Sequence, residues 1–105
     1  MEQRVRLYIS GKISGDSSYK DKFDAARRYY EDRGYVVINP AVLPGGLDPA
    51  DYARICFAMI DSADAVAFLP DYQMSAGAML EYQYCLYIDK SIKYLSGGDL
   101  YGFGK

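Results

Sequence analysis

The chain has 105 residues, 50% of them hydrophobic and 25% charged, with two cysteines and no histidine. This length allows a single domain, and this balance is typical of a folded globular protein. A net charge of −2 and a pI of about 4.9 argue against a nucleic-acid-binding surface, which needs a basic face. The lack of histidine excludes a Ser-His or Cys-His catalytic pair and argues against zinc, so we expect no metal and no cofactor.

The first predicted elements are a strand, a helix and a second strand. A short apolar run predicts a strand over 5–10, and the Gly and Ser residues that follow make 11–18 a loop. Apolar residues at helical spacing predict a helix over 19–33, which Gly34 ends. The β-branched run 35–38 predicts the second strand.

The middle of the chain predicts two more helices around a buried strand. Asp48 is placed to cap a helix over 49–62 that begins with a proline. The continuous apolar run 65–69 is typical of a central strand that is covered on both faces. Ser75 is placed to cap a third helix that continues to about Asp89.

The order of these elements predicts an α/β fold. The fourth strand is expected over 91–95, and the glycine-rich segment 96–105 is expected to be a loose tail or one that a partner orders. Residues 1–95 then form a small doubly wound domain, flavodoxin-like or Rossmann-like, with helices on both faces. Its parallel sheet has four to five strands in the order 2-1-3-4. Ligands bind such sheets beyond the carboxyl ends of strands 1 and 3, which directs attention to 8–15 and 70–81.

The apolar patterns of the sequence predict the oligomeric state of the domain and its compartment. The second and third helices are apolar nearly all round, which predicts a homodimer or a larger assembly packed through them. No apolar run is long enough to cross a bilayer, and the start of the chain lacks an apolar targeting segment. Cys56 and Cys85 lie in apolar helical contexts that fit a reducing compartment, so we expect a cytoplasmic protein without a membrane partner.

The loop after the first strand is the first candidate for chemistry. Gly11 and Gly15 let the backbone approach a ligand closely, and the loop offers free amides, hydroxyl groups and the ammonium of Lys12 to a phosphate. The loop matches neither a Walker motif nor a dinucleotide-binding motif. A plain turn between a strand and a helix is the alternative.

Ser75 and Glu81 form the second candidate. Ser75 brings a hydroxyl and free amides to the positive end of a helix. Glu81 lies nearly two turns further along this otherwise apolar helix, where a buried carboxylate must be paired or functional. The alternative is an exposed Glu81 in an ion pair. Among nearby acids, Asp71 lies at the ligand end of the sheet, and Asp61 and Asp64 lie at the opposite end as structural residues.

Four segments of the chain together resemble the nucleoside 2-deoxyribosyltransferase-like superfamily. They are Tyr8 to Gly15, Gly34 to Pro40, Ala63 to Val66 and Ser75 to Glu81, within a resemblance that covers residues 4–95. The resemblance is to the small, mostly uncharacterised branch found in bacteria and phages. It implies cleavage or exchange of the base at the N-glycosidic bond of deoxynucleosides or their 5′-monophosphates.

The resemblance also implies roles for single residues. Glu81 attacks the anomeric carbon to form a covalent glycosyl-enzyme, which is the logic of retaining glycosidases. Tyr8 lies close to the sugar and to Glu81. The phosphate-binding positions are Gly11, Lys12, Ile13, Ser14 and Ser75. With Ser10, Gly15, Cys56, Pro70, Asp71 and Gly77 they make up the expected substrate site.

Cys56 departs from the family pattern. The family usually has an aspartate here that assists the departing base, and a general acid contributes about 10²–10⁴-fold. A slow enzyme, another acid such as Asp71 or Asp51, or a protein that only binds would each fit this departure. An inert core thiol is the simplest interpretation of Cys56 itself.

Three functions follow from these observations. The first is an N-glycosidase that acts on a 2′-deoxynucleoside 5′-monophosphate. The second is a non-catalytic module that binds a small-molecule nucleotide. The third is a deoxyribosyltransferase, placed below the hydrolase because a lysine and two serines in the first loop favour a phosphate.

Overall fold

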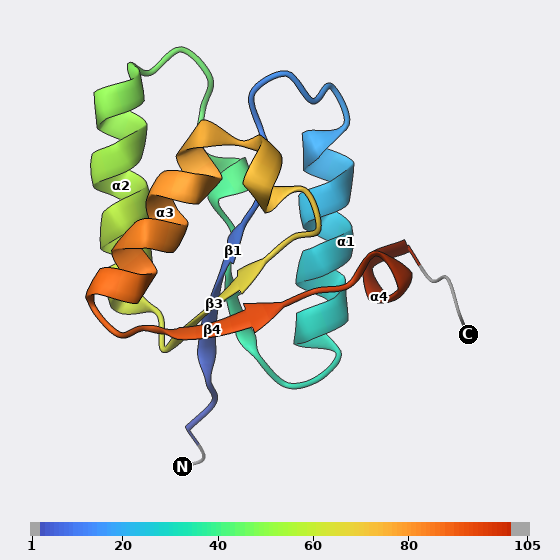
Figure 1. Cartoon of the computed structure of the whole chain (residues 1–105). Helices are drawn as coiled ribbons and strands as arrows, with labels where there is room; N and C mark the ends of the chain where they lie inside the picture. Colours follow the sequence, from blue (N-terminus) through green and yellow to red (C-terminus); the bar gives the residue numbers. More distant parts are fainter. Residues whose placement is uncertain (1–2, 102–105) are drawn as a thin grey trace.

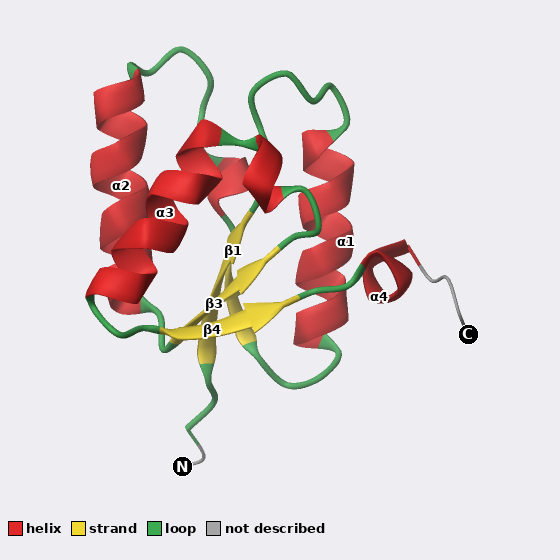
Figure 2. Ribbon diagram, viewed as in Figure 1, coloured by secondary structure: helices red, strands yellow, loops and turns green. Residues whose placement is uncertain are grey.

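Each pair of strands that follow one another along the chain is connected through a helix, and the strands of the sheet all run parallel (Figures 1 and 2). The computed structural model describes residues 3–101. The strands are β1 (Arg6–Ser10), β2 (Val36–Ile38), β3 (Ala65–Phe68) and β4 (Ser91–Tyr94). The helices are α1 (Tyr19–Glu31), α2 (Pro49–Ser62), α3 (Ala76–Tyr87) and α4 (Gly97–Tyr101), with short 3-10 turns η1 (Pro40–Val42) and η2 (Tyr72–Met74). The order β2-β1-β3-β4 confirms the predicted doubly wound sheet, with four strands.

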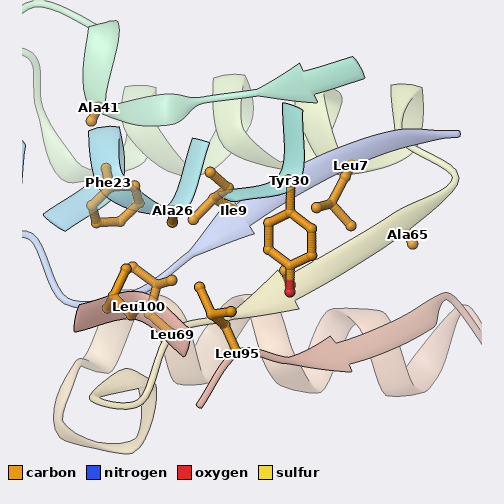
Figure 3. Close-up of a cluster of buried hydrophobic side chains, with 11 residues drawn as sticks. Leu7, Ile9, Phe23, Ala26, Tyr30, Ala41, Ala65, Leu69, Leu95 and Leu100 are labelled. Carbon is orange, nitrogen blue, oxygen red and sulfur yellow. The ribbon is translucent and has the colours of Figure 1, made fainter. Parts of the chain in front are cut away.

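The central strand β1 divides its side chains between the two faces of the sheet. Leu7 and Ile9 lie in the core that α1 and α4 cover, together with Phe23 and Leu100 (Figure 3). Tyr8 alternates with them and lies in the core under α2 and α3. Because side chains alternate along a strand, Ser10 shares the face of Tyr8. This alternation brings the hydroxyl groups of Tyr8 and Ser10 to one side of the sheet.

The helix starts agree with the predicted caps. The amide of Asp48 donates to the carboxylate of Asp51 at 3.3 Å, which ties the residue before α2 to its first turn. The Ser75 hydroxyl accepts from the amide of Ala78 at 3.1 Å at the start of α3. Asp89 adopts a φ of 58°, a left-handed conformation that ends helices, so α3 ends at Tyr87, close to the predicted end.

The prediction of a loose tail over 96–105 is wrong for residues 97–101. These residues form α4, which packs against α1. Ser96 accepts a hydrogen bond from the amide of Asp99 at 3.0 Å, and Leu100 is only 6% exposed within the core. The apolar anchor and the serine cap therefore outweigh the glycines. Residues 102–105 of that prediction lie outside the described residues.

Within residues 3–101, no helix combines the length and the hydropathy that a membrane crossing requires.

Candidate functional site

A cavity of about 840 Å³ opens beyond the carboxyl end of β1. Its walls come from the loop after β1, the segment between β2 and α2, one face of α2 and the first turns of α3. These segments meet at one end of the molecule (Figure 2). The predicted site residues that line the cavity are Tyr8, Ser10, Gly11, Ile13, Ser14, Cys56, Ser75, Gly77 and Glu81.

Glu81 is held in this cavity by two hydroxyl groups of β1. The Ser10 hydroxyl donates to Oε1 at 2.7 Å, and the Tyr8 hydroxyl donates to Oε2 at 3.1 Å. Both donors lie on the face of β1 that α3 covers, so the alternation of the strand delivers them together. The alternative of an exposed, ion-paired glutamate is therefore wrong.

Burial sets the protonation of the groups around Glu81. Burial raises the pKa of its carboxyl above the ordinary value of 4.5, and the hydrogen bonds from Ser10 and Tyr8 oppose that shift. Burial, with the charge of Glu81, raises the Tyr8 pKa well above 10.0. Burial likewise raises the pKa of the Cys56 thiol above 9.0. Near neutral pH, the tyrosine and the thiol beside the carboxylate thus keep their protons.

The cavity has a polar end at the start of α3. Ser75, Ala76 and Gly77 line it there. Among the described residues, the amides of Ala76 and Gly77 have no hydrogen-bond partner, as expected for the first turn of a helix. These amides and the positive end of the helix suit an anion. The part of the lining that comes from α2 and the segment before it is mostly apolar and includes Pro40, Leu43, Leu47, Tyr52 and Phe57.

Four predicted substrate residues do not line the cavity: Lys12, Gly15, Pro70 and Asp71. The amide of Lys12 donates to Asp71 Oδ1 at 3.1 Å, so that amide is not free for a phosphate. The other oxygen of Asp71 accepts from Lys22 at 2.5 Å. Asp71 is thus engaged elsewhere, and the alternative acid Asp51 bonds the amide of Asp48 and the guanidinium of Arg54. Neither carboxylate reaches the cavity to replace the missing aspartate.

Gly11 lines the cavity and also packs closely against Leu69. A Cβ at Gly11 would lie 2.8 Å from Cδ1 and 3.0 Å from Cβ of Leu69. A larger residue at this position would therefore require the Leu69 side chain to shift. Gly15, in contrast, has a φ of 81°, a conformation that favours glycine for backbone reasons.

Lys22 was not predicted from the sequence to lie near the site. This residue of α1 is buried, and its ammonium donates to the carbonyl of Lys12 at 2.8 Å and to Asp16 at 2.5 Å as well as to Asp71. The available signal was its spacing, because Lys22 shares the buried face of α1 with Ala26 and Tyr30. A lysine in a buried stripe must have partners.

No curated protein matches the chain. The family model for a domain of unknown function, DUF4406, matches residues 5–94. The match spans the whole sheet and every residue of the cavity described above. The chain therefore belongs to the DUF4406 family.

Proposed function

We propose that this chain is an N-glycosidase that cleaves the bond between base and sugar in a 2′-deoxynucleoside 5′-monophosphate. The observation that carries the proposal is the Glu81 carboxylate, which lines the cavity while Ser10 and Tyr8 hold its two oxygens. A positioned carboxylate in a concave site is the group that covalent glycoside cleavage needs. The resemblance to nucleoside 2-deoxyribosyltransferases supports the same role.

In this mechanism an oxygen of Glu81 attacks C1′ of the sugar. The bond from C1′ to the base nitrogen breaks, its electron pair stays with the base, and the base takes a proton from water. A second water molecule then hydrolyses the glycosyl ester and releases the sugar phosphate; its remaining proton neutralises the hydroxide left by the first water, which restores the carboxylate. Ser10 and Tyr8 keep the carboxylate aimed, which is an entropic contribution to the rate.

The cavity can take a nucleotide in one orientation. Its volume of about 840 Å³ falls in the range of roughly 300–1,000 Å³ that is usual for small-molecule sites. The phosphate belongs at the polar end, near Ser14, Ser75 and the free amides of α3. The base belongs against the apolar wall that includes Tyr52 and Phe57. Glu81 lies beside the sugar between them.

Substrate and compartment complete the proposal. A nucleotide is a soluble metabolite, and Cys56 and Cys85 are buried free thiols that suit a reducing cytoplasm. We therefore place the protein in the cytoplasm. Base exchange between nucleosides stays the third candidate. The argument that places it below hydrolysis is weaker than expected, because Lys12, one of the residues expected to bind a phosphate, does not line the cavity.

A non-catalytic nucleotide-binding module is the second candidate. The observation that favours it is Cys56, which lines the cavity where the resembled family has an aspartate. In the part of the chain that is described, Glu81 is the one carboxylate in the lining. A module of this kind binds a nucleotide without releasing its base.

The test of the first candidate is base release. Purified protein is incubated with each deoxynucleoside monophosphate, and free base is measured by chromatography. We expect release by the wild type and a loss of about 10³-fold or more in Glu81→Gln, because the nucleophile is gone. Gln83→Ala, an exposed change on the same helix, is the matched control and keeps full activity. No release from any substrate, with Glu81→Gln indistinguishable from the wild type, contradicts the proposal.

A second substitution separates a weak enzyme from a binding module. Cys56→Asp restores a carboxylic acid beside Glu81, and we expect base release to rise by about 10²-fold. Calorimetry with the same nucleotides measures binding in parallel. Tight binding with no turnover in either protein favours the module.

A further inference from the structure

A buried lysine joins the two loops that form the polar end of the cavity. Lys22 is 6% exposed, and its ammonium bonds three oxygens. Two belong to the loop after β1: the carbonyl of Lys12 at 2.8 Å and the carboxylate of Asp16 at 2.5 Å. The third belongs to the loop after β3, the carboxylate of Asp71 at 2.5 Å. One side chain of α1 therefore fixes both loops.

The same two loops carry the groups that face the anion end of the cavity. Ser14 lies between Lys12 and Asp16 in the first loop, and it lines the cavity. Asp71 precedes η2, which leads directly to Ser75 and the first turn of α3. The amide of Lys12 donates to Asp71 at 3.1 Å and makes a second link between the loops. The network thus joins the segment that carries Ser14 to the segment that leads to Ser75.

The ammonium of Lys22 is committed to this network. Burial alone would lower its pKa, but the hydrogen bonds to Asp16 and Asp71 outweigh burial, and the pKa is raised above 10.5. The hydrogen bond from Lys22 also lowers the pKa of Asp16. Buried charges of this kind seldom stabilise a fold more than well-packed apolar residues of the same volume. Placement of the two loops gives the lysine a role that an apolar residue could not fill.

We propose that Lys22 is a positioning residue that holds the loop after β1 and the start of α3 in the geometry that binds the 5′-phosphate. This inference rests on the proposed function and concerns its phosphate end. Lys22 does not line the cavity, so it acts on the substrate only through the residues it holds. Misplacing a binding group by about 1 Å can cost about 10²-fold in rate.

The experiment uses a variant in which the network is neutral. Lys22→Met alone would leave two carboxylates unpaired and endanger the fold, so it is combined with Asp16→Asn and Asp71→Asn. The amide oxygens of both asparagines can still accept from the backbone amides that the carboxylates now serve, those of Ser18 and Lys12. Circular dichroism and thermal unfolding establish that the triple variant is folded.

The readout compares a substrate that has the phosphate with one that lacks it. We expect kcat/KM for the deoxynucleoside monophosphate to fall by about 10- to 100-fold in the triple variant, mostly through KM. For the corresponding deoxynucleoside, kcat/KM stays unchanged. A merely structural role of Lys22 would lower both values alike.

Arg27→Met is the matched control. Arg27 lies on the same helix and also bonds two carboxylates, Asp24 and Glu31, but away from the cavity. We expect this variant to leave kcat/KM unchanged for both substrates. Equal losses for both substrates in the triple variant, or no loss for either, overturn the positioning role while the proposed function stands.

Absence of turnover in the wild type would instead count against the proposed function. The role of Lys22 is then decided by calorimetry on the same proteins. A rise of about tenfold in the Kd of the monophosphate alone supports it, and an unchanged Kd overturns it.

Discussion

Glu81 brings a carboxylate into a cavity whose walls are mostly apolar, and its two hydrogen bonds do not fully replace the water it loses. The net effect is the raised pKa of its carboxyl. A side chain in this position costs stability whenever it is ionised. Such a cost is common where a residue serves chemistry rather than folding.

Glu81→Gln should therefore stabilise the protein at neutral pH. The folded-state pKa lies above the unfolded value, so the folded state binds more protons between the two, and stability falls as pH rises through that window. Above the window the wild type carries the full penalty, and we expect Glu81→Gln to be more stable by about 1 kcal/mol. Well below pH 4.5 the advantage disappears, because the wild-type carboxyl is protonated in both states.

Urea unfolding of both proteins at neutral and acid pH measures this difference. Gln83→Glu, which adds a carboxylate to an exposed position of the same helix, is the control and shows no such dependence. An advantage of Glu81→Gln that is equal at both pH values would show that ionisation is not its cause.

Single residues of the site were predictable where their position follows from regular structure. The family resemblance implied that Tyr8 lies close to Glu81, and the alternation of β1 could also have assigned Ser10 to Glu81 rather than to substrate. Lys12 and Asp71 were misplaced because they bond each other across two loops. Loop conformations of this kind depend on tertiary contacts that no local pattern encodes.

At the scale of elements, local signals predicted the strand order and the helix starts. Asp48 and Ser75 are caps whose chemistry is readable from the sequence. The last helix was missed because glycines dominate its segment, while the residue that stabilises it, Leu100, gains its energy only from packing on α1.

Leu100→Ala tests whether α4 belongs to the domain. Leu100 is 6% exposed in the core next to Phe23 and Leu69, and we expect the change to lower the free energy of unfolding by about 2–3 kcal/mol. Val42→Ala, at a residue that is 75% exposed, should cost less than about 0.5 kcal/mol. Denaturant unfolding of both variants makes the comparison. A loss at Leu100 no larger than at Val42 would mean that residues 97–101 add nothing to the fold.

At the scale of the whole molecule, α3 has two apolar sides. Ala78 and Cys85 are buried toward the sheet, whereas Leu80 is 52% exposed and Tyr87 is 90% exposed. Leu80 and Tyr87 are two turns apart and so lie on one outward face of the helix. Apolar surface of this kind on a small domain favours self-association. Leu80 also lines the cavity, so association through this face would cover part of the cavity rim.

We therefore expect the protein to form a homodimer or a larger assembly through α3. Sedimentation equilibrium at micromolar concentration should show this, and Tyr87→Glu should weaken association at least about tenfold, or about 1.4 kcal/mol, because a charge replaces an apolar contact. Val42→Glu adds the same charge at another exposed apolar position and should leave association unchanged. A wild type that sediments as a monomer throughout would contradict the expectation. If Tyr87→Glu also changes the KM for nucleotide while the folded state stays intact, the association face and the cavity rim are one surface.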